Sequence, residues 1–366
     1  MVKKSKASRS GSPESVFQEC RRLDQQLLKL LAERARLYER LARHRITEGQ
    51  TAWDPHTEVA WQQEMLAAGA APLSEASLRA ILAEIQSGCR ALIKPLRVAY
   101  LGPEHSYSYL AATARFGHSV ELVPVATIAA VFEEVHYGQA ALGVVPLENS
   151  TDGRVVDTLD MFARMPVRIC GEVQLRIHHF LAARCPRDKI TEVYSKPQAL
   201  SQCRGWLARH LPGVRTIEMT STARAAQIAA EKEGAAAIAS REAAQHYGLE
   251  IVAANIEDNP NNITRFAVLG EMPSRRTGKD KTALMFQVPH RPGALADAMV
   301  VFKKAQLNLT WIESFPVQGA PQEYLFFAEF EGHESEARVK RALAALGKKT
   351  LRLNVLGSYA VAPPAE

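Results

Sequence analysis

The sequence predicts a multidomain protein with an all-α domain first, a two-lobed α/β domain in the middle and an α+β, ferredoxin-like domain last. Its 366 residues exceed the length of about 250–300 residues at which a single core stops growing. The apolar spacing is helical up to Lys94-Pro95 and then changes to short alternating strand and helix patterns. A linker-like stretch at 272–280 separates a final βαββαβ pattern from the rest.

The composition is that of a soluble globular protein, with 47% hydrophobic and 23% charged residues. No apolar run approaches the roughly 18–20 residues of a membrane span, so we expect no membrane partner. Five cysteines without a C-x-x-C pair favour a reducing cytoplasm over a disulfide framework or a zinc ribbon. No Walker A or G-x-G-x-x-G sequence is present, and we expect neither a cofactor nor a metal.

The net charge of +6 comes largely from the first residues. Lys3, Lys4, Lys6 and Arg9 precede the first acid, Glu14. The remaining domains are nearly balanced, so the charge does not indicate a nucleic-acid partner. We expect residues 1–12 to form a disordered basic tail rather than a targeting signal, because they contain no apolar h-region.

Residues 13–94 carry the helical pattern. A long helix from Pro13 to about Glu48 is predicted by apolar spacings of three and four, and helices from Pro55 to Ala68 and from Ser74 to Ile93 follow. Arg34 falls on the apolar stripe of the first helix, where it must find an anion or reach solvent at the edge of the bundle. So small a core predicts dimerisation.

Residues 97–271 alternate between strands and helices, which predicts open α/β sheets. This segment is too long for one comfortable lobe, so we expect two lobes with a cleft between them. The predicted strands are 98–101, 120–125, 141–145, 168–181, 192–194, 214–219, 236–239 and 266–269. After the linker, residues 281–360 form the βαββαβ unit, which contains no nucleophile or base and is interpreted as a binding module.

Four polar loops stand at strand ends of the α/β segment. Ser106 and Ser108 lie at a predicted helix N-terminus, which favours an anion, although Ser108 is equally explained as a plain helix cap. The loop 145–153 carries five polar side chains and is either a site or a solvated surface loop. The third loop, 194–198, leads into a helix on which Gln198 and Gln202 share one face.

The fourth loop, 261–265, places Thr264 at the mouth of a predicted strand, where it is either a turn residue or part of a ligand site. The four loops together offer hydroxyls and amides, with Glu148 as the one well-placed acid. His178-His179 falls inside a predicted strand, and two neighbours that face opposite sides are more typical of core plus surface than of a metal site. A site made of the hydroxyls and amides of these four loops suits a small polyanionic ligand.

Three of these loops resemble prephenate dehydratases in sequence, order and context. They read Val-Pro-Leu-Glu-Asn-Ser-Thr-Asp-Gly at 145–153, Val-Tyr-Ser-Lys-Pro-Gln at 193–198 with Gln202-Cys203, and Asn-Ile-Thr-Arg-Phe at 262–266. Nearly everything after the tail resembles the bacterial bifunctional chorismate mutase–prephenate dehydratase (P-protein) family. The resemblance implies an AroQ-type helical mutase domain, a periplasmic-binding-protein-like pair of lobes with prephenate in the cleft, and an ACT regulatory domain.

The resemblance implies decarboxylative dehydration of prephenate to phenylpyruvate in L-phenylalanine biosynthesis. Thr264 matches the donor to the departing hydroxyl, and because threonine is a weak acid we expect transition-state hydrogen bonding rather than bulk acid catalysis. The remaining implied substrate residues are Asn149, Ser195 and Gln202, with Ser106, Ser108, Ser150 and Thr151 as nearby donors to carboxylates. His105 departs from the family, which usually has Gly there.

The mutase-like segment departs further from its family. Arg34, Arg45 in place of the usual Lys, Asp54 and Glu58 match the mutase site. At three positions this sequence departs from the mutase family. Phe17 stands where the family has an Arg, Thr57 where it has a second Arg, and Ile93 where it has a Gln or Glu. Charge-assisted contacts are worth about 1.5–3 kcal/mol each, so we expect a weakly active or inactive mutase that persists as a dimerisation element. The alternative is a fully bifunctional enzyme.

The last domain resembles ACT domains in two phenylalanine-binding loops. Gly293-Ala294-Leu295 matches the first, and Glu313-Ser314-Phe315-Pro316 matches the second except that Phe315 replaces Arg. We therefore expect feedback inhibition by L-phenylalanine through an ACT–ACT interface that includes Asn308, in a homodimer or homotetramer. Two other functions remain open, an arogenate dehydratase and a non-catalytic amino-acid sensor.

Overall fold

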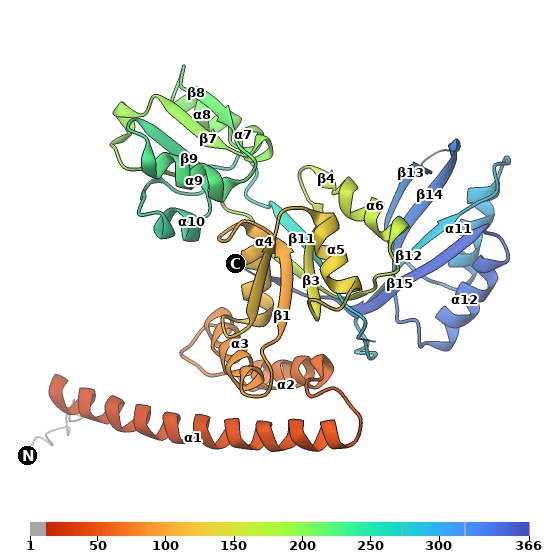
Figure 1. Cartoon of the computed structure of the whole chain (residues 1–366), viewed down its shortest axis with the longest axis horizontal. Helices are drawn as coiled ribbons and strands as arrows, with labels where there is room; N and C mark the ends of the chain where they lie inside the picture. Colours follow the sequence, from red (N-terminus) through yellow and green to blue (C-terminus); the bar gives the residue numbers. More distant parts are fainter. Residues whose placement is uncertain (1–11, 273, 318–319, 366) are drawn as a thin grey trace, which may run out of the picture.

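The computed structural model describes residues 12–272, 274–317 and 320–365. Four bodies are visible in Figure 1: a helical domain, two α/β lobes and a C-terminal α+β domain. The predicted basic tail lies outside the described residues except for Ser12, which caps the first helix. Within the described part of the chain, none of the helices combines the length and apolar character of a membrane span.

The helical domain contains α1 (Pro13–Thr47), α2 (Pro55–Ala68) and α3 (Glu75–Ala91), as predicted. Ser12 and Ser74 accept hydrogen bonds from backbone N–H groups of the first turns of α1 and α3. Ala42 is the buried residue of α1, and most of its apolar stripe faces solvent. The exposed members include Val16, Leu23, Leu27, Leu30, Leu37 and Leu41, and the neighbouring Phe17 and Leu28 are exposed as well. In the described part of the chain, most of this long helix is therefore left uncovered by the other elements (Figure 1).

The first lobe is built on a mixed sheet in the order β16-β5-β11-β3-β1-β2, with β4 beside β3. Its strands are β1 (Arg97–Leu101), β2 (Glu121–Val125), β3 (Leu142–Asn149), β4 (Gly153–Arg154), β5 (Ile169–Arg176), β11 (Ile263–Leu269) and β16 (Pro364–Ala365). Its helices are α4 (Tyr107–Phe116), α5 (Ile128–His136) and α6 (Val156–Arg164). Strands β1, β2 and β3 are parallel, and β11 runs antiparallel between β3 and β5.

The second lobe has its own sheet in the order β10-β6-β9-β7-β8. Its strands are β6 (Phe180–Ala183), β7 (Glu192–Ser195), β8 (Arg215–Glu218), β9 (Ala235–Ala239) and β10 (Glu250–Ala253). Its helices are η1 (Arg187–Lys189), α7 (Pro197–Gln202), α8 (Arg204–His210), α9 (Thr222–Glu231) and α10 (Arg241–His246). The chain crosses between the lobes after β5 and again before β11, so the predicted two-lobed arrangement is confirmed (Figure 1).

Two strand predictions are wrong. The predicted strand 168–181 is two strands, β5 and β6, which belong to different sheets. His178 and His179 lie between them, because the Glu257 carboxylate holds His178 Nδ1 at 2.8 Å and accepts from the backbone N–H of His179 at 2.9 Å. Strand β11 begins at Ile263 rather than Phe266, so Thr264 lies within the strand instead of before it.

The C-terminal domain is the predicted ferredoxin-like βαββαβ unit. It comprises β12 (Asp280–Gln287), α11 (Ala294–Lys304), β13 (Leu309–Val317), β14 (Ala320–Glu331), α12 (Ala337–Gly347) and β15 (Arg352–Ala360). The antiparallel sheet has the order β13-β14-β12-β15. Both helices pack on one face, around a core that includes Phe286, Phe302 and Phe330.

The C-terminal domain shares a core with the first lobe. Val145 and Leu269 of the lobe lie in one apolar cluster with Met285 and Phe327 of the domain. At Gly357 of β15 a Cβ atom would lie 2.0 Å from the carbonyl oxygen of Ile169 in β5, so only glycine permits this approach of the two backbones. Beyond β15 the chain continues into β16, which pairs in parallel with β5. The two domains are therefore packed together, and the linker is not their sole connection.

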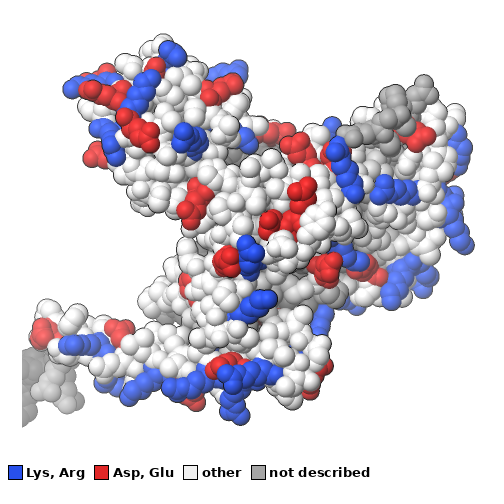
Figure 2. Space-filling model, in the orientation of Figure 1, with Lys and Arg blue, Asp and Glu red and all other residues white. Residues whose placement is uncertain are grey.

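Charge is distributed differently over the domains on the face shown in Figure 2. Lys and Arg side chains line α1, whereas positive and negative side chains are mixed over the second lobe. No single-sign surface covers all the domains on this face.

Candidate active site

Thr264 and Asn149 face each other on neighbouring antiparallel strands. They are register partners in the β11–β3 pairing, and Asn149 Nδ2 donates a hydrogen bond of 2.8 Å to Thr264 Oγ1. Within the described residues the Thr264 hydroxyl proton has no side-chain or backbone acceptor. Since the oxygen accepts from Asn149, that proton is directed elsewhere and is available to a ligand.

The loop after β3 is folded around the Asn149 side chain. Asn149 Oδ1 accepts the backbone N–H groups of Thr151 at 2.9 Å and Asp152 at 3.0 Å, which is an Asx-type turn. Ser150 extends the pairing with β11, because its N–H donates to the carbonyl of Ile263 at 2.8 Å and its Oγ accepts the Ile263 N–H at 2.9 Å. The loop is therefore held rigidly against the start of β11.

A chain of side-chain hydrogen bonds continues from this point to the second lobe. Asn149 Nδ2 also donates to Asn262 Oδ1 at 2.8 Å, and Asn262 Nδ2 donates to Gln202 Oε1 of α7 at 2.9 Å. Gln202 Nε2 in turn donates to Asp152 Oδ2 at 2.9 Å. We call the connected set Thr264, Asn149, Asn262, Gln202, His179 and Tyr107 the inter-lobe network.

His179 and Tyr107 complete the inter-lobe network. His179 Nε2 lies 2.8 Å from Gln202 Oε1, and its Nδ1 lies 3.1 Å from the Tyr107 hydroxyl. Because the Gln202 oxygen can only accept, the His179 proton resides on Nε2 and Nδ1 is an acceptor. Burial lowers the pKa of His179 below its ordinary value, more than the hydrogen bond to Gln202 raises it. The imidazole is neutral near pH 7 and holds Gln202 in place.

A second inter-lobe contact involves His105. Its backbone has a φ of 61°, a conformation that glycine adopts more easily, and its ring lies 3.8 Å from the His246 ring of α10 at an interplanar angle of 30°. Burial, followed by the neighbouring His246, lowers the pKa of His105. This histidine therefore adds a contact between the lobes that a glycine could not make.

In the helical domain two of the four predicted residues pair with each other, and Arg34 and Glu58 have other partners. Arg45 Nη1 lies 3.4 Å from Asp54 Oδ2, to which the Thr57 hydroxyl donates at 2.7 Å. Arg34 donates to the Cys89 sulfur at 3.0 Å and stacks over the Trp61 ring. The partners of Arg34 are therefore a thiol and an aromatic ring, and not the expected anion.

The charge of Glu58 is neutralised by Arg90, which the sequence did not indicate as a site residue. Arg90 Nη1 lies 2.6 Å from Glu58 Oε2, both side chains are buried, and Arg90 Nη2 donates to the carbonyl of Phe116 in α4 at 2.5 Å. Burial, and then the charge of Glu58, raises the pKa of the nearby Tyr38 hydroxyl. Through Arg90, Glu58 of the helical domain is therefore linked to the first lobe.

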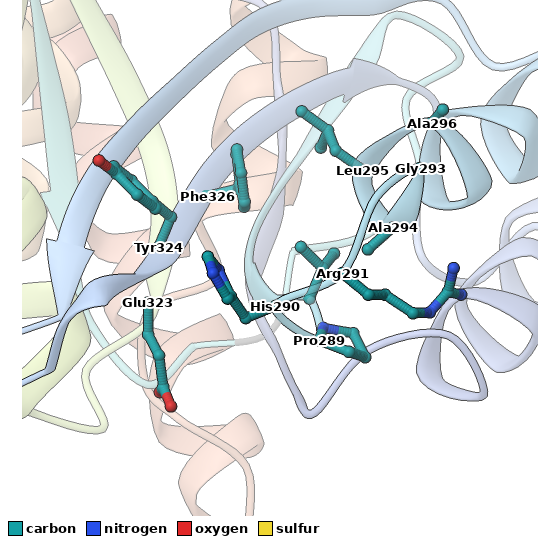
Figure 3. A pocket seen from close by; sticks show the side chains of 11 residues that line it. Pro289, His290, Arg291, Gly293, Ala294, Leu295, Ala296, Glu323, Tyr324 and Phe326 are labelled. Carbon is teal, nitrogen blue, oxygen red and sulfur yellow. The ribbon is translucent and has the colours of Figure 1, made fainter.

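The C-terminal domain contains a cavity of about 310 Å³ between β14 and the turn that begins α11 (Figure 3). Gly293, Ala294 and Leu295 line it, and Gly293 has a φ of 78° that suits glycine at the helix start. Phe326 contributes an apolar wall, and Glu323 and His290 contribute polar groups. The other predicted effector residues, Asn308, Glu313 and Ser314, are not among its lining residues in this single chain.

The sequence also matches known families over nearly its whole length. Residues 98–274 match the family model of prephenate dehydratase, and residues 16–94 match that of chorismate mutase type II. The chain is 41% identical over 344 residues to the bifunctional chorismate mutase/prephenate dehydratase of Stutzerimonas stutzeri, covering 92% of this chain and 94% of the relative. The chain belongs to the bifunctional chorismate mutase/prephenate dehydratase family.

Further relatives agree with this membership. The bifunctional chorismate mutase/prephenate dehydratase of Aquifex aeolicus is 42% identical over 345 residues, which is 92% of this chain and 95% of the relative. The crystal structure of an Arthrobacter aurescens prephenate dehydratase in complex with L-Phe is 32% identical, with a TM-score of 0.68, covering 73% of this chain and 90% of that one. The predicted family and the predicted enzyme, a prephenate dehydratase, are confirmed.

Of the predicted substrate residues of this family member, Asn149 and Gln202 belong to the inter-lobe network. The other five do not: Ser106, Ser108, Ser150, Thr151 and Ser195. Ser195 is fully buried, and its hydroxyl donates to the carbonyl of Ile238 at 2.6 Å. Ser106 caps α4 and donates to the carbonyl of Leu101 at 3.2 Å, while Ser108 is buried in the first turn of that helix. The acid Glu148 is also engaged, because it pairs with Arg265 at 2.8 Å. By contrast, Thr151 lies at the edge of the network, with its hydroxyl 3.5 Å from Asn262 Oδ1.

Sequence reasoning missed four residues around Thr264: Asn262, Asp152, His179 and Tyr107. Asn262 and Asp152 stand inside polar loops that had been noted, and their proximity to Thr264 and Asn149 in sequence was a usable signal. No sequence signal pointed to His179 or Tyr107 as a neighbour of Thr264. Each of them joins the network only when the two lobes are assembled. Within the described residues no group of three or more His, Cys, Asp or Glu side chains could hold a metal ion.

Neutral His179 makes the stability of the enzyme depend on pH. The folded state binds a proton at His179 less readily than the unfolded chain, so the free energy of unfolding falls as pH drops through the unfolded pKa of about 6.5. We expect His179→Gln to show a smaller loss of stability between about pH 7.5 and about pH 5.5 than the parent chain. Urea unfolding at the two pH values measures the difference, and the exposed His136→Gln is the control. Identical pH dependence of the parent and His179→Gln would contradict the assignment.

Proposed function

We propose that the chain converts prephenate to phenylpyruvate in the route to L-phenylalanine, with Thr264 as the hydrogen-bond donor to the departing hydroxyl. The observation that carries the proposal is the Thr264 hydroxyl, whose oxygen accepts from Asn149 at 2.8 Å while its proton remains available. In this reaction the bond to the ring carboxylate breaks and CO2 leaves. The electron pair enters the ring, the ring C–OH bond breaks, and the hydroxide takes a proton to leave as water.

The inventory of groups around Thr264 suits this chemistry. Aromatisation of the ring supplies the driving force, so the site has to orient the substrate and stabilise a poor leaving group. Asn149 fixes the Thr264 hydroxyl, Asn262 accepts a hydrogen bond from Asn149, and Gln202 of the second lobe accepts one from Asn262. A fixed donor that requires no reorganisation during the reaction favours the transition state over the bound substrate. This is the role we assign to Thr264.

The substrate carboxylates require donors of their own. We assign Ser106 and Ser108 to one carboxylate because the N-cap Ser106 and the first-turn Ser108 stand at the N-terminus of α4, where free backbone N–H groups and the helix dipole favour an anion. Ser150 and Thr151 are assigned as nearby donors from the loop after β3. Gln202 is assigned as a substrate ligand from the second lobe, and Ser195 as a support of the strand end beside it.

Replacing Thr264 by Val removes the donor while nearly preserving the side-chain shape. Loss of one preorganised donor typically costs about 10²–10³-fold in kcat, so we expect a decrease of that size in phenylpyruvate formation from prephenate. The control Thr264→Ser keeps the hydroxyl and is expected to retain most of the activity. The rates are measured as phenylpyruvate absorbance in alkali.

The same assay separates the alternatives. Equal rates for the parent and Thr264→Val would remove Thr264 from the mechanism. A parent chain that turns over arogenate faster than prephenate would be an arogenate dehydratase. A parent chain that forms product from neither substrate would be an amino-acid sensor.

For the helical domain we propose weak or absent chorismate mutase activity and a role in dimerisation. Thr57 stands where the family has a cation, and its hydroxyl hydrogen-bonds Asp54. Glu58 is neutralised by Arg90, and Phe17 is exposed on α1 in place of another cation. The exposed apolar stripe of α1 is the surface that a second copy would cover, which supports a homodimer or a tetramer.

The mutase proposal is tested on the full chain. Two missing charge-assisted contacts amount to about 3–6 kcal/mol, so we expect kcat/KM for chorismate to be about 10²–10⁴-fold below that of a competent mutase. The double variant Phe17→Arg/Thr57→Arg restores both cations and is expected to raise the rate. Chorismate disappearance is the measurement, and parent turnover equal to that of a competent mutase would contradict the proposal.

We further propose that L-phenylalanine binds the C-terminal cavity and inhibits the dehydratase. The cavity of about 310 Å³ has the size of a small-molecule site, with apolar side chains and a few polar groups at its edge. Asn308, Glu313 and Ser314 are assigned to the interface that a second copy would form beside this cavity. The crystal structure of the Arthrobacter aurescens relative in complex with L-Phe supports this choice of effector.

A charge in the cavity wall tests the effector site. Leu295→Asp places a carboxylate beside the phenyl position, and we expect at least about tenfold weaker inhibition by L-phenylalanine, because an unpaired charge in an apolar pocket is costly. The exposed Leu351→Asp in the same domain is the control. Dehydratase rate and sedimentation are followed against L-phenylalanine concentration. If L-phenylalanine alters neither activity nor oligomeric state of the parent chain, the proposal is wrong.

A further inference from the structure

Arg265, the residue next to Thr264 on β11, faces the opposite side of the sheet. Its Nη1 lies 2.8 Å from Glu148 Oε2 on β3, and its Nη2 lies 3.1 Å from Glu172 Oε2 on β5. Glu148 immediately precedes Asn149 and is the register partner of Arg265. One guanidinium thus clamps the strands on both sides of β11, directly behind Thr264 and Asn149.

The third partner of Arg265 comes from the C-terminal domain. Both carboxylate oxygens of Glu329 on β14 lie within 2.9 Å of Arg265 Nη2. The Glu329 side chain is completely buried, and it also accepts a hydrogen bond from the Tyr359 hydroxyl of β15. The guanidinium carbon lies 5.6 Å from the centroid of the Trp311 ring of β13. We call Arg265, Glu148, Glu172, Glu329 and Tyr359 the Arg265 cluster.

The charges of the Arg265 cluster hold it together. Lys281 of β12 lies 3.4 Å from Glu172, so two cations face three carboxylates. Burial disfavours the charged guanidinium, but Glu329 and the other acids overcome this and raise the pKa of Arg265. A buried carboxylate left without its cation is strongly unfavourable, so Glu329 fixes where Arg265 must lie.

A second ion pair ties the same loop to the same domain. Arg154 of β4 pairs with Glu313 of β13. Strand β4 lies beside the end of β3, with Gly153 opposite Asn149 and Arg154 opposite Glu148. The segments that carry Asn149 and Thr264 are therefore both anchored to strands β13 and β14 of the C-terminal domain.

We propose that Glu329 of the C-terminal domain is a positioning residue of the dehydratase site, which acts by holding Arg265 against Glu148 and so fixing the Asn149–Thr264 pair. This inference rests on the proposed function of Thr264. It makes the C-terminal domain part of the structure of the active site, in addition to its proposed effector cavity. None of the residues that line that cavity belongs to the Arg265 cluster.

The chain provides a matched control for this contact. Arg168 and Glu334 also pair between the first lobe and the C-terminal domain, at 2.6 Å, but both side chains of this pair are partly exposed. Arg168 precedes the start of β5, whereas Thr264 is the register partner of Leu175 near the other end of that strand. Loss of this second pair removes an interdomain ion pair without touching the neighbours of Thr264.

Glu329→Gln in the full chain tests the proposal. We expect kcat for phenylpyruvate formation to fall about 10–100-fold with KM nearly unchanged, because misplacement of Thr264 affects the transition state more than substrate binding. Glu334→Gln is expected to keep both constants. Tyr359→Phe removes a hydrogen bond to Glu329 and is expected to lower kcat more mildly, so it replaces Glu329→Gln if that variant does not fold.

Hydrogen exchange provides a readout that does not depend on activity. We expect Glu329→Gln to speed exchange of backbone amides in residues 145–153 and 262–266, and Glu334→Gln to leave them unchanged. A parent chain inactive on prephenate would overturn the proposed function, and the exchange data would still decide whether Glu329 orders these segments. Unchanged kcat and unchanged exchange in folded Glu329→Gln and Tyr359→Phe would overturn the positioning role.

Discussion

The antiparallel register between β3 and β11 is the constraint on which the site depends. It places Asn149 opposite Thr264 and Glu148 opposite Arg265. Because successive residues of a strand point to opposite faces, the first pair faces the second lobe and the second pair faces the C-terminal domain. A shift of one residue would exchange the two faces and disrupt both sets of contacts.

A bulge next to this pairing sets its register. The pairing shifts between Arg265 and Phe266, so that Phe266 lies opposite Pro146 and Leu147 is the extra residue. The Leu147 carbonyl accepts the N–H of Val155, and the Pro146 carbonyl accepts the Thr158 hydroxyl. Proline has no N–H to contribute to a ladder, which suits a position where regular pairing ends. The polar loop after β3 therefore meets β11 in one defined alignment.

The inter-lobe network consists of neutral groups, and the charged Asp152 contacts it from outside through Gln202. Amides, hydroxyls and one imidazole can satisfy each other when the lobes meet, and none carries the desolvation cost of a buried charge. Charged groups are gathered on the opposite face of the sheet, around Arg265, where several carboxylates share a cation. This separation leaves the Thr264 hydroxyl as a donor with a free proton, which matches a reaction whose difficulty lies in the leaving group.

The sequence by itself determined the order of domains, the helical and strand periods and the identity of the polar loops that carry Asn149, Gln202 and Thr264. These features are local, because apolar spacing and turn residues are written in consecutive positions. It did not determine the partners of single side chains. Ser195 sits at a predicted site loop, yet its hydroxyl satisfies the carbonyl of Ile238.

Only the tertiary structure decided which distant residues meet. Glu257 splits the predicted strand 168–181, Arg90 neutralises Glu58, and Glu329 reaches Arg265 from another domain. Each of these contacts joins charged or polar groups far apart in the chain, and each forms because a buried polar group must find a partner. A sequence shows that such a group is present, but the partner it finds depends on which surfaces the fold brings together.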